Sequence, residues 1–171
     1  MSRLHCVFDS SAYIKHFNKE EEYSELVEEI FSHPQLIAVY LPNVCIPEIV
    51  RAIFRLCYER KISASLRDNL YNAFIKEIRS YRVFIHNVTH RNIVLTDEIL
   101  KKALRRRTGA TSLSPIDALV IASAVSINKA ISNVRLVTND VDLAKIAHRF
   151  GLKVWLLSKL KKSWIRSAIR K

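Results

Sequence analysis

Short apolar runs alternate with longer amphipathic stretches along this chain of 171 residues. Apolar runs of roughly four to eight residues predict buried strands, and they occur at residues 3–8, 35–42, 81–88, 134–138 and 153–157. The stretches between them repeat apolar residues at helical spacing, over residues 11–17, 19–32, 48–60, 64–79, 90–106, 114–127 and 142–150. Strands that alternate with helices predict an α/β fold with a parallel sheet.

The helix predicted at residues 114–127, with the sequence SPIDALVIASAVSI, differs from the others. Ser114 is a typical N-cap residue, and Pro115 fits the first turn, where it forfeits no helical hydrogen bond. The residues that follow are small or apolar on every face, which predicts a helix that is buried all round. Asp117 is the exception, because an ionised carboxylate in such surroundings is costly unless something compensates it.

Composition bounds the organisation of the chain. An apolar content of 49% supports one domain with a real core, and two glycines and four prolines exclude long flexible linkers. We expect one domain over residues 1–157, followed by a basic tail at 158–171 that belongs to the domain or is appended to it. Trp164 in this tail either stacks on a nucleobase or, as its helical spacing favours, packs the last helix onto the body.

The location of the protein is also constrained. No stretch reaches the roughly 18 apolar residues that a membrane span requires, and the first residues do not form a secretion signal. The three cysteines are scattered among apolar neighbours, which fits buried, reduced thiols better than a disulfide framework. We therefore expect a cytoplasmic protein that does not enter the membrane.

The net charge of +12 indicates a polyanionic partner. Six of the sixteen acidic residues lie within residues 19–29, so the rest of the chain is strongly basic. Basic runs at residues 101–109 and 159–171 favour nucleic acid as the partner, although lysines that simply face water give the same composition. Arg105, Arg106 and Arg107 are candidates for contacts with phosphates, or they complement the negative end of a helix dipole.

Four carboxylates fall where strands end and helices begin. Asp9 follows the first strand, Glu48 opens the helix after the second, Asp117 lies in the first turn of the buried helix, and Asp140 follows the fourth strand. In a parallel sheet these places share one edge. Each acid has a structural alternative as a helix cap or a surface ion-pair partner. Asp142 follows Asp140 closely and is a fifth candidate.

The chemistry of such a cluster is metal-dependent hydrolysis. A basic chain that gathers its few acids at one edge is expected to hold cations there, and carboxylates suit Mg²⁺ or Mn²⁺. A bound cation can activate water for attack on a phosphodiester. Without metal the carboxylates repel one another, so at least one should have a raised pKa.

Four segments in this order resemble the PIN domain nucleases, and most closely the toxin ribonucleases of VapBC-type toxin–antitoxin pairs. They are VFDSSAYIK, PEIVRA, SPIDALVIASA and LVTNDVDLAK. The resemblance implies an α/β/α sandwich with a central parallel five-stranded sheet. It implies catalytic carboxylates at Asp9, Glu48, Asp117 and Asp140, with Asp142 as an auxiliary ligand.

The resemblance also implies how the site works and what it binds. Ser10, Ser11 and Thr138 match hydroxyl positions that help to hold the carboxylates. The implied activity is Mg²⁺- or Mn²⁺-dependent cleavage of RNA by a homodimer that an antitoxin protein inhibits. Leu143 departs from the family, where Phe is common, and residues 60–112 are longer than in minimal toxins.

Three other functions remain open from the sequence. The chain could bind RNA without cutting it, with its acids acting as caps, or it could process RNA as a PIN protein without a toxin role. A phosphatase of the haloacid dehalogenase type also uses acids at strand ends. That type requires a second aspartate two residues after the first, where this chain has Ser11 after Asp9.

Overall fold

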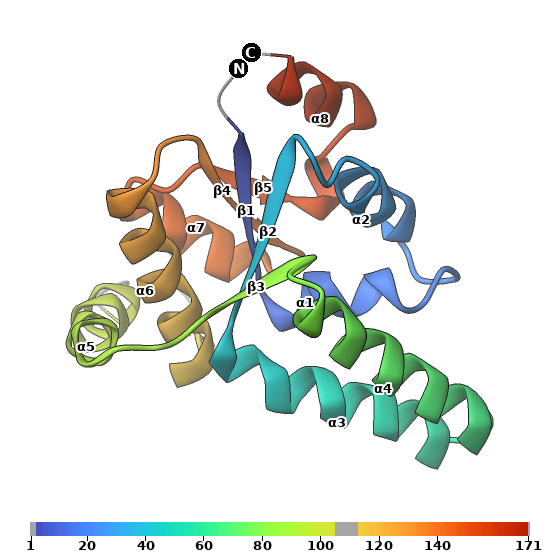
Figure 1. Ribbon diagram of the computed structural model, residues 1–171. Helices are drawn as coiled ribbons and strands as arrows, with labels where there is room; N and C mark the ends of the chain where they lie inside the picture. The colour runs from blue at the N-terminus through green and yellow to red at the C-terminus, as the bar shows by residue number, and fades with distance from the viewer. Residues whose placement is uncertain (1–2, 105–112, 171) are drawn as a thin grey trace.

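The protein is built around five parallel strands in the order β3-β2-β1-β4-β5 (Figure 1). A computed structural model describes residues 3–104 and 113–170. The strands are β1 (Leu4–Phe8), β2 (Ile37–Pro42), β3 (Val83–His86), β4 (Val134–Thr138) and β5 (Val154–Leu156). The predicted α/β class and the five-stranded parallel sheet are therefore confirmed.

Register fixes which strand ends lie together. Val7 of β1 is level with Tyr40 of β2 and with Leu136 of β4, so the carboxyl ends of these three central strands reach the same edge. Almost every residue of β1 and β4 is buried, as expected for parallel strands covered on both faces. This covered edge is where polar groups at strand ends are held close to one another.

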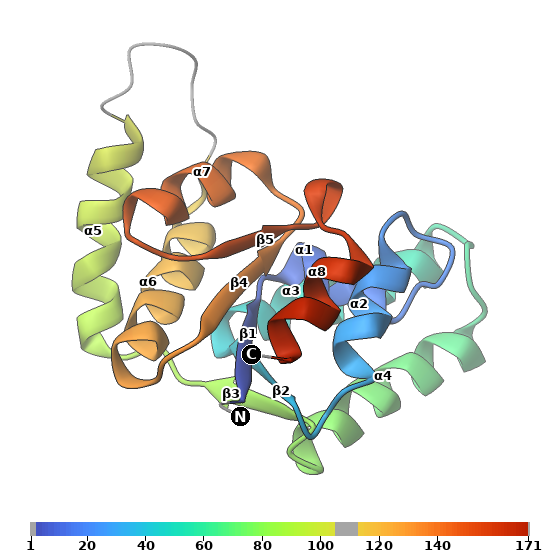
Figure 2. The ribbon, with the colours of Figure 1, turned by 90° about the horizontal axis from the view of Figure 1, so that it is seen from above.

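Helices cover both faces of the sheet. The α-helices of the described residues are α1 (Ser10–Tyr13), α2 (Ser24–Phe31), α3 (Ile46–Tyr58), α4 (Ala64–Arg79), α5 (His90–Leu104), α6 (Pro115–Ala130), α7 (Val141–Arg149) and α8 (Lys162–Ile169). Short 3-10 turns are η1 (Ile14–His16), η2 (Asn43–Cys45) and η3 (Leu157–Lys159). In Figure 2, α5, α6 and α7 lie on one side of the sheet, and α1 to α4 with α8 lie on the other.

The buried helix predicted around residues 114–127 is α6. Eight of its residues are buried, from Ala118 to Ile127. It packs against α5, β4, α7 and the turn η2, so its small side chains are enclosed by neighbours on several sides. The N-terminal turn of α6 carries Asp117, and its contact with η2 brings that turn toward the start of α3.

The helix predicted at residues 19–32 is shorter than expected. It begins at Ser24, because Tyr23 before it has a φ of 68°, in the left-handed region that a continuing right-handed helix cannot use. The segment before Tyr23 forms turns instead. The predicted helix at 11–17 is likewise divided into α1 and η1.

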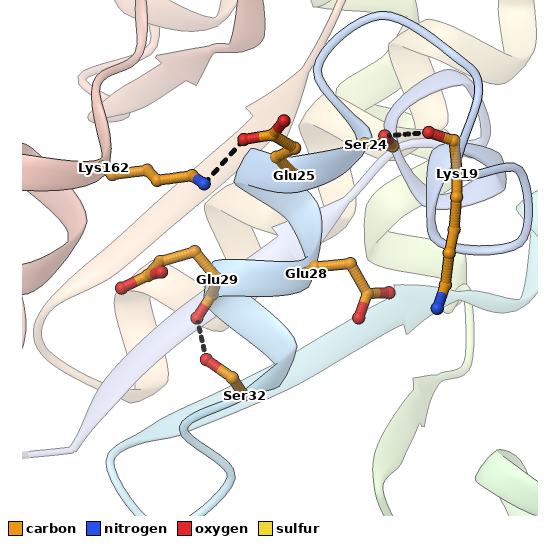
Figure 3. Close-up of a pocket in the computed structure, with 7 residues that line it drawn as sticks. All are labelled: Lys19, Ser24, Glu25, Glu28, Glu29, Ser32 and Lys162. Atoms are coloured by element: carbon orange, nitrogen blue, oxygen red, sulfur yellow. Dashed lines mark hydrogen bonds and ion pairs between the residues drawn. The ribbon is translucent and has the colours of Figure 1, made fainter.

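The basic tail forms α8 and packs on the acidic helix α2. The Lys162 amine lies 2.7 Å from a Glu25 carboxylate oxygen, and Arg166 donates to Glu29 over 2.7 Å. Figure 3 shows the acidic side chains of α2 that face Lys162. Ile165 of α8 is fully buried. The boundary expected after residue 157 stays a prediction.

The expected packing role of Trp164 is wrong. Its side chain is 53% exposed, and the neighbouring Ile165 anchors α8 instead. The helical spacing predicted an apolar face but did not identify which of the two adjacent residues would point inward, because both are large and apolar.

A polar network crosses the core beneath α1 and α4. The Tyr13 hydroxyl donates to a Glu77 carboxylate oxygen over 2.7 Å, and the His16 Nε2 lies 2.8 Å from the other oxygen. Burial alone would raise the pKa of Glu77, but the contacts with His16, Tyr13 and Arg82 outweigh it and leave the pKa below its usual value. The ionised carboxylate is therefore the form that the fold stabilises.

No helix within residues 3–104 and 113–170 is long and apolar enough to cross a membrane.

Replacement of Glu77 by Gln should lower the free energy of unfolding by about 1–3 kcal/mol at pH 7, because a buried, charge-assisted hydrogen-bond network loses its acceptor charge. The depressed pKa means that the wild-type advantage exists above the unfolded pKa and disappears as the pH falls through the folded one. Urea unfolding at several pH values measures the difference.

The matched control is Glu98→Gln, which removes an exposed ion pair with Lys102 on α5. Such pairs contribute little, so its unfolding midpoint should stay close to that of the wild type. Equal midpoints for Glu77→Gln and the control would contradict the assigned role of the network.

Candidate active site

The candidate site is built on the carboxyl ends of the three central strands. Asp9 follows β1 and Asp140 follows β4, while Glu48 lies in the first turn of α3 after β2 and η2. Asp117 comes from the first turn of α6. Because β2, β1 and β4 are adjacent in the sheet, the residues that directly follow these strands lie along the same edge.

Asp9 forms the floor of the site. Its side chain is 3% exposed and accepts hydrogen bonds from the Ala12 backbone N–H at 2.7 Å and the Thr138 hydroxyl at 2.5 Å. The Ser11 hydroxyl lies 3.1 Å and 3.0 Å from its two oxygens. The backbone bond makes Asp9 the N-cap of α1, so the predicted capping role and the site position coexist.

Burial raises the pKa of Asp9 to about 6, against the hydrogen bonds from Thr138, Ala12 and Ser11 that favour the charged form. Repulsion from Asp117 adds to the increase. The sequence-based expectation of a raised pKa in this cluster is therefore confirmed for Asp9, with desolvation as the main cause and the neighbouring charge as a smaller one.

Hydroxyl groups tie the other carboxylates to Asp9. The Ser10 hydroxyl donates to a Glu48 oxygen over 2.5 Å, which links the residue after Asp9 to the start of α3. The Thr138 hydroxyl that donates to Asp9 also accepts from the Asp140 backbone N–H at 2.9 Å. Ser10, Ser11 and Thr138 thus each hold a carboxylate-bearing segment in place.

Asp140 and Asp142 occupy the outer part of the site. Asp140 is exposed and caps α7, accepting from the backbone N–H groups of Asp142 and Leu143 at 2.7 Å and 2.9 Å. Asp142 is half-buried, and its side chain lies 3.0 Å from the Lys145 amine. The contribution of Asp142 to a metal site stays a prediction, because its one ion pair among the described residues is with Lys145 on the same helix.

Asp117 closes the capping box at the start of α6. Its carboxylate accepts from the Ser114 backbone N–H at 2.9 Å, and the Ser114 hydroxyl accepts from the Asp117 N–H at 3.1 Å. One oxygen is thereby committed to the helix start. Within residues 3–104 and 113–170, no hydrogen bond to the second oxygen is formed.

Two residues that sequence reasoning passed over also belong to this region. Cys45 is buried, and after burial itself the charges of Asp9, Glu48 and Asp117 all raise the pKa of its thiol. Cys45 stands three residues before Glu48, a spacing that places two residues on one helical face and could have drawn attention to it.

Asn139 is the second such residue. Its side-chain oxygen is buried and has no hydrogen-bond partner among the described residues. Asn139 lies between Thr138 and Asp140 in the chain. A buried acceptor without a partner is costly, which is the pattern expected of a group that serves a ligand or water.

The donor set fits a hard divalent cation. The groups are carboxylate, hydroxyl and amide oxygens, which suit Mg²⁺ or Mn²⁺ better than softer metals. Within the described residues, no three His, Cys, Asp or Glu side chains form a ready-made metal cage. Mg²⁺ does not require one, because it commonly binds through one or two carboxylates and keeps several waters.

The remaining predicted site residues, Arg105, Arg106 and Arg107, lie outside the described residues, so their expected phosphate contacts stay a prediction.

Comparison with known proteins identifies the family. The family model for the PIN domain matches residues 6–149 and so includes the four carboxylates and Asp142. The chain belongs to the PIN domain family. A search of curated protein sequences found no significant match.

Several solved structures have the same fold. The VapBC2 complex from Rickettsia felis, bound to promoter DNA, matches with a TM-score of 0.61 and 12% identity over 89% of this chain and 98% of that one. FitAcB from Neisseria gonorrhoeae matches with a TM-score of 0.59 and 13% identity over 91% and 99%.

VapC20 from Mycobacterium tuberculosis, a toxin that cleaves the sarcin–ricin loop, matches with a TM-score of 0.53 and 17% identity over 82% of this chain and 93% of that one. At these identities the likeness shows the fold. The PIN domain assignment and the carboxylate geometry then carry the argument about chemistry.

Replacement of Asp9 by Asn should stabilise the metal-free PIN domain at pH 7.5 by up to about 3 kcal/mol, because it removes a buried charge. The raised pKa sets the sign: the charged form of Asp9 penalises folding above pH 6, and the penalty fades as the pH falls through about 6 toward the unfolded value. Thermal unfolding in EDTA at pH 5 and pH 7.5 measures the gain.

Asp97→Asn on the exposed face of α5 is the control, and it removes an ion pair with Lys101 instead of relieving a buried charge. It should leave stability unchanged or slightly lower. Added Mg²⁺ should stabilise the wild type more than Asp9→Asn. A destabilised Asp9→Asn protein at pH 7.5 would contradict the account.

Proposed function

We propose that this PIN domain protein is a Mg²⁺- or Mn²⁺-dependent endoribonuclease that acts as the toxin of a toxin–antitoxin pair. The observation that carries the chemistry is the placement of Asp9, Glu48 and Asp140 after three adjacent parallel strands, where the hydroxyls of Thr138 and Ser10 link them by hydrogen bonds. PIN domains are nucleases, and the match to this family covers most of the chain.

The four carboxylates lie at different depths in the site. Asp9 is buried at the floor, Glu48 and Asp117 are half-buried, and Asp140 is exposed at the rim. These four carboxylates would hold the cation, with Asp142 as an auxiliary. When bound, such a cation lowers the pKa of a water and neutralises charge that develops on the phosphate oxygens.

Hydroxyl groups of the chain hold the carboxylates of the site in position. Thr138 and Ser11 hold the Asp9 carboxylate, and Ser10 holds Glu48. The donors are fixed by caps and strand ends, so their positions cost little to organise when a substrate arrives. No covalent nucleophile is required, since water supplies the attacking oxygen in a hydrolysis of this type.

RNA is the proposed substrate because the chain is strongly basic outside α2. The net charge of +12 attracts a polyanion at long range. The structurally similar VapC20 cleaves an RNA loop, which supports RNA over DNA as the target. Three free thiols fit the proposed cytoplasmic location.

The toxin role and its partners rest on the structural neighbours. The similar chains from Rickettsia felis and Neisseria gonorrhoeae belong to the VapBC2 and FitAcB structures. We propose a cognate antitoxin for this chain, and a homodimer as its own assembly. A PIN protein that matures cellular RNA without a toxin role remains the alternative.

Asp117→Asn should reduce the rate of RNA cleavage by at least about 100-fold, because a metal-holding carboxylate becomes neutral. The Asn side chain can still accept from the Ser114 N–H, so the capping box and the fold should survive. Purified protein is incubated with a panel of structured RNAs in Mg²⁺, in Mn²⁺ or in EDTA, and the fragments are resolved on gels.

Asp97→Asn, an exposed acid on α5, serves as the charge-matched control and should cleave like the wild type. The proposal fails if the wild type binds these RNAs but cuts none of them with either metal. That result would favour a binding module whose carboxylates are caps.

The toxin role has its own test in growing bacteria. Induced expression of the wild type should arrest growth within a few generations, and Asp117→Asn at equal expression should not, because growth arrest requires cleavage. Cleavage in the tube without growth arrest would favour the RNA-processing alternative.

A further inference from the structure

A small hollow with a largely apolar lining lies at the β5 edge of the sheet, next to the start of α7. It has a volume of about 280 Å³. Figure 2 shows β5 at this edge with α7 on one side and α8 on the other. The apolar lining from these elements comprises Val141, Ala144, Val154, Trp155, Leu156 and Trp164, and Leu160 adds to it.

The hollow is close to the candidate active site. Val141 in its wall directly follows Asp140 in the chain. Leu156 in the same wall is the register partner of Thr138, whose hydroxyl holds Asp9. Neighbouring strands are about 4.8 Å apart, so this wall stands one strand from Thr138 and two strands from the Asp9 floor, at the same end of the sheet.

The basic side chains around the hollow include two lysines, of which Lys145 already pairs with Asp142. Lys145, His148 and Lys159 line it together with the apolar residues, and within the described chain no acidic residue lines it. Lys159 forms no ion pair with any described residue, so its charge is available to a ligand.

A second hollow of about 260 Å³ continues past the two tryptophans. Arg135 lines it, and burial lowers the pKa of its guanidinium, which donates to the Val134 carbonyl and has no carboxylate partner among the described residues. A half-buried cation without an acidic partner is suited to an anion. The path along the β5 edge therefore alternates basic, aromatic and basic groups.

Trp164 is the aromatic element of this path. It is half exposed, while Ile165 beside it anchors α8, so the indole is held in place without being covered. Aromatic faces flanked by cations are the usual platform for single-stranded nucleic acid. The volume lies just below the range of roughly 300–1,000 Å³ for pockets that take whole ligands, which fits one planar base.

We propose that this hollow is a subsite for one unpaired nucleobase of the RNA substrate, with Trp164 as its stacking platform. Lys159 and Arg135 contact the phosphates on either side of that nucleotide. The inference rests on the proposed ribonuclease function and adds a requirement to it: the RNA must present an unstacked base next to the bond that is cut.

The first test uses the fluorescence of Trp164. The chain has two tryptophans, so Trp155→Phe leaves Trp164 as the sole emitter, and Asp117→Asn is included to prevent cleavage. Single-stranded oligoribonucleotides should quench the emission. An abasic oligonucleotide of equal length carries the same charge without bases and should not quench it. Quenching by both, or by neither, overturns the stacking role.

The second test keeps Trp155 and measures affinity directly. In the Asp117→Asn background, Trp164→Ala should weaken binding of a fluorescein-labelled oligoribonucleotide by roughly 5- to 100-fold, the loss expected for one stacked base. Tyr58→Ala on α3 is the control, because Tyr58 is an 89% exposed aromatic residue remote from β5. Equal affinity of the two variants overturns the subsite.

The outcomes separate the two proposals. If the wild type cleaves RNA and Trp164→Ala does not weaken RNA binding, the subsite is overturned and the proposed nuclease function stands. Binding that depends on Trp164 without cleavage by the wild type overturns the nuclease and supports the RNA subsite. Quenching by polyglutamate but not by RNA would assign the hollow to an acidic peptide and overturn the proposal.

Discussion

The hydrogen bond from the Thr138 hydroxyl to the buried carboxylate of Asp9 joins the ends of β1 and β4 at 2.5 Å. The same hydroxyl accepts from the backbone N–H of Asp140, so one side chain fixes the floor of the site and the start of α7 together. The rest of the site depends on this contact. Without it the Asp9 charge would lose one of the few groups that offset its burial, and the segment that carries Asp140 would lose its side-chain link to Asp9.

A buried acid whose pKa is raised destabilises the folded protein when it is ionised. A fold keeps such an acid only where the charge has a function. In this PIN domain the surroundings are arranged to favour charge at Asp9 through three donors, yet burial and the nearby Asp117 still outweigh them. The protein therefore supplies more negative charge here than its own donors stabilise, which supports the proposed cation site. The negative charge of Asp9 therefore lowers the stability of the fold while it serves the proposed function.

Much of this architecture could be predicted from the sequence, because the relevant signals are local. Strand runs, helix caps and the all-apolar face of α6 each follow from neighbouring residues, and the carboxyl ends of parallel strands meet by topology alone. Other features depend on contacts between distant segments. The exposure of Trp164 and the burial of Ile165 follow from how α8 seats on α2. The hydrogen bonds from Thr138 to Asp9 and from Ser10 to Glu48 also needed the assembled sheet.

The most direct measurement is the location of Mn²⁺ in a crystal of the wild-type protein, found from its anomalous scattering. The account predicts one or two strong peaks among Asp9, Glu48, Asp117 and Asp140, and their loss in crystals of Asp9→Asn grown in the same way. Peaks that appear only elsewhere, or none at these carboxylates at saturating Mn²⁺, would contradict the claim that this edge of the sheet is a metal-dependent active site.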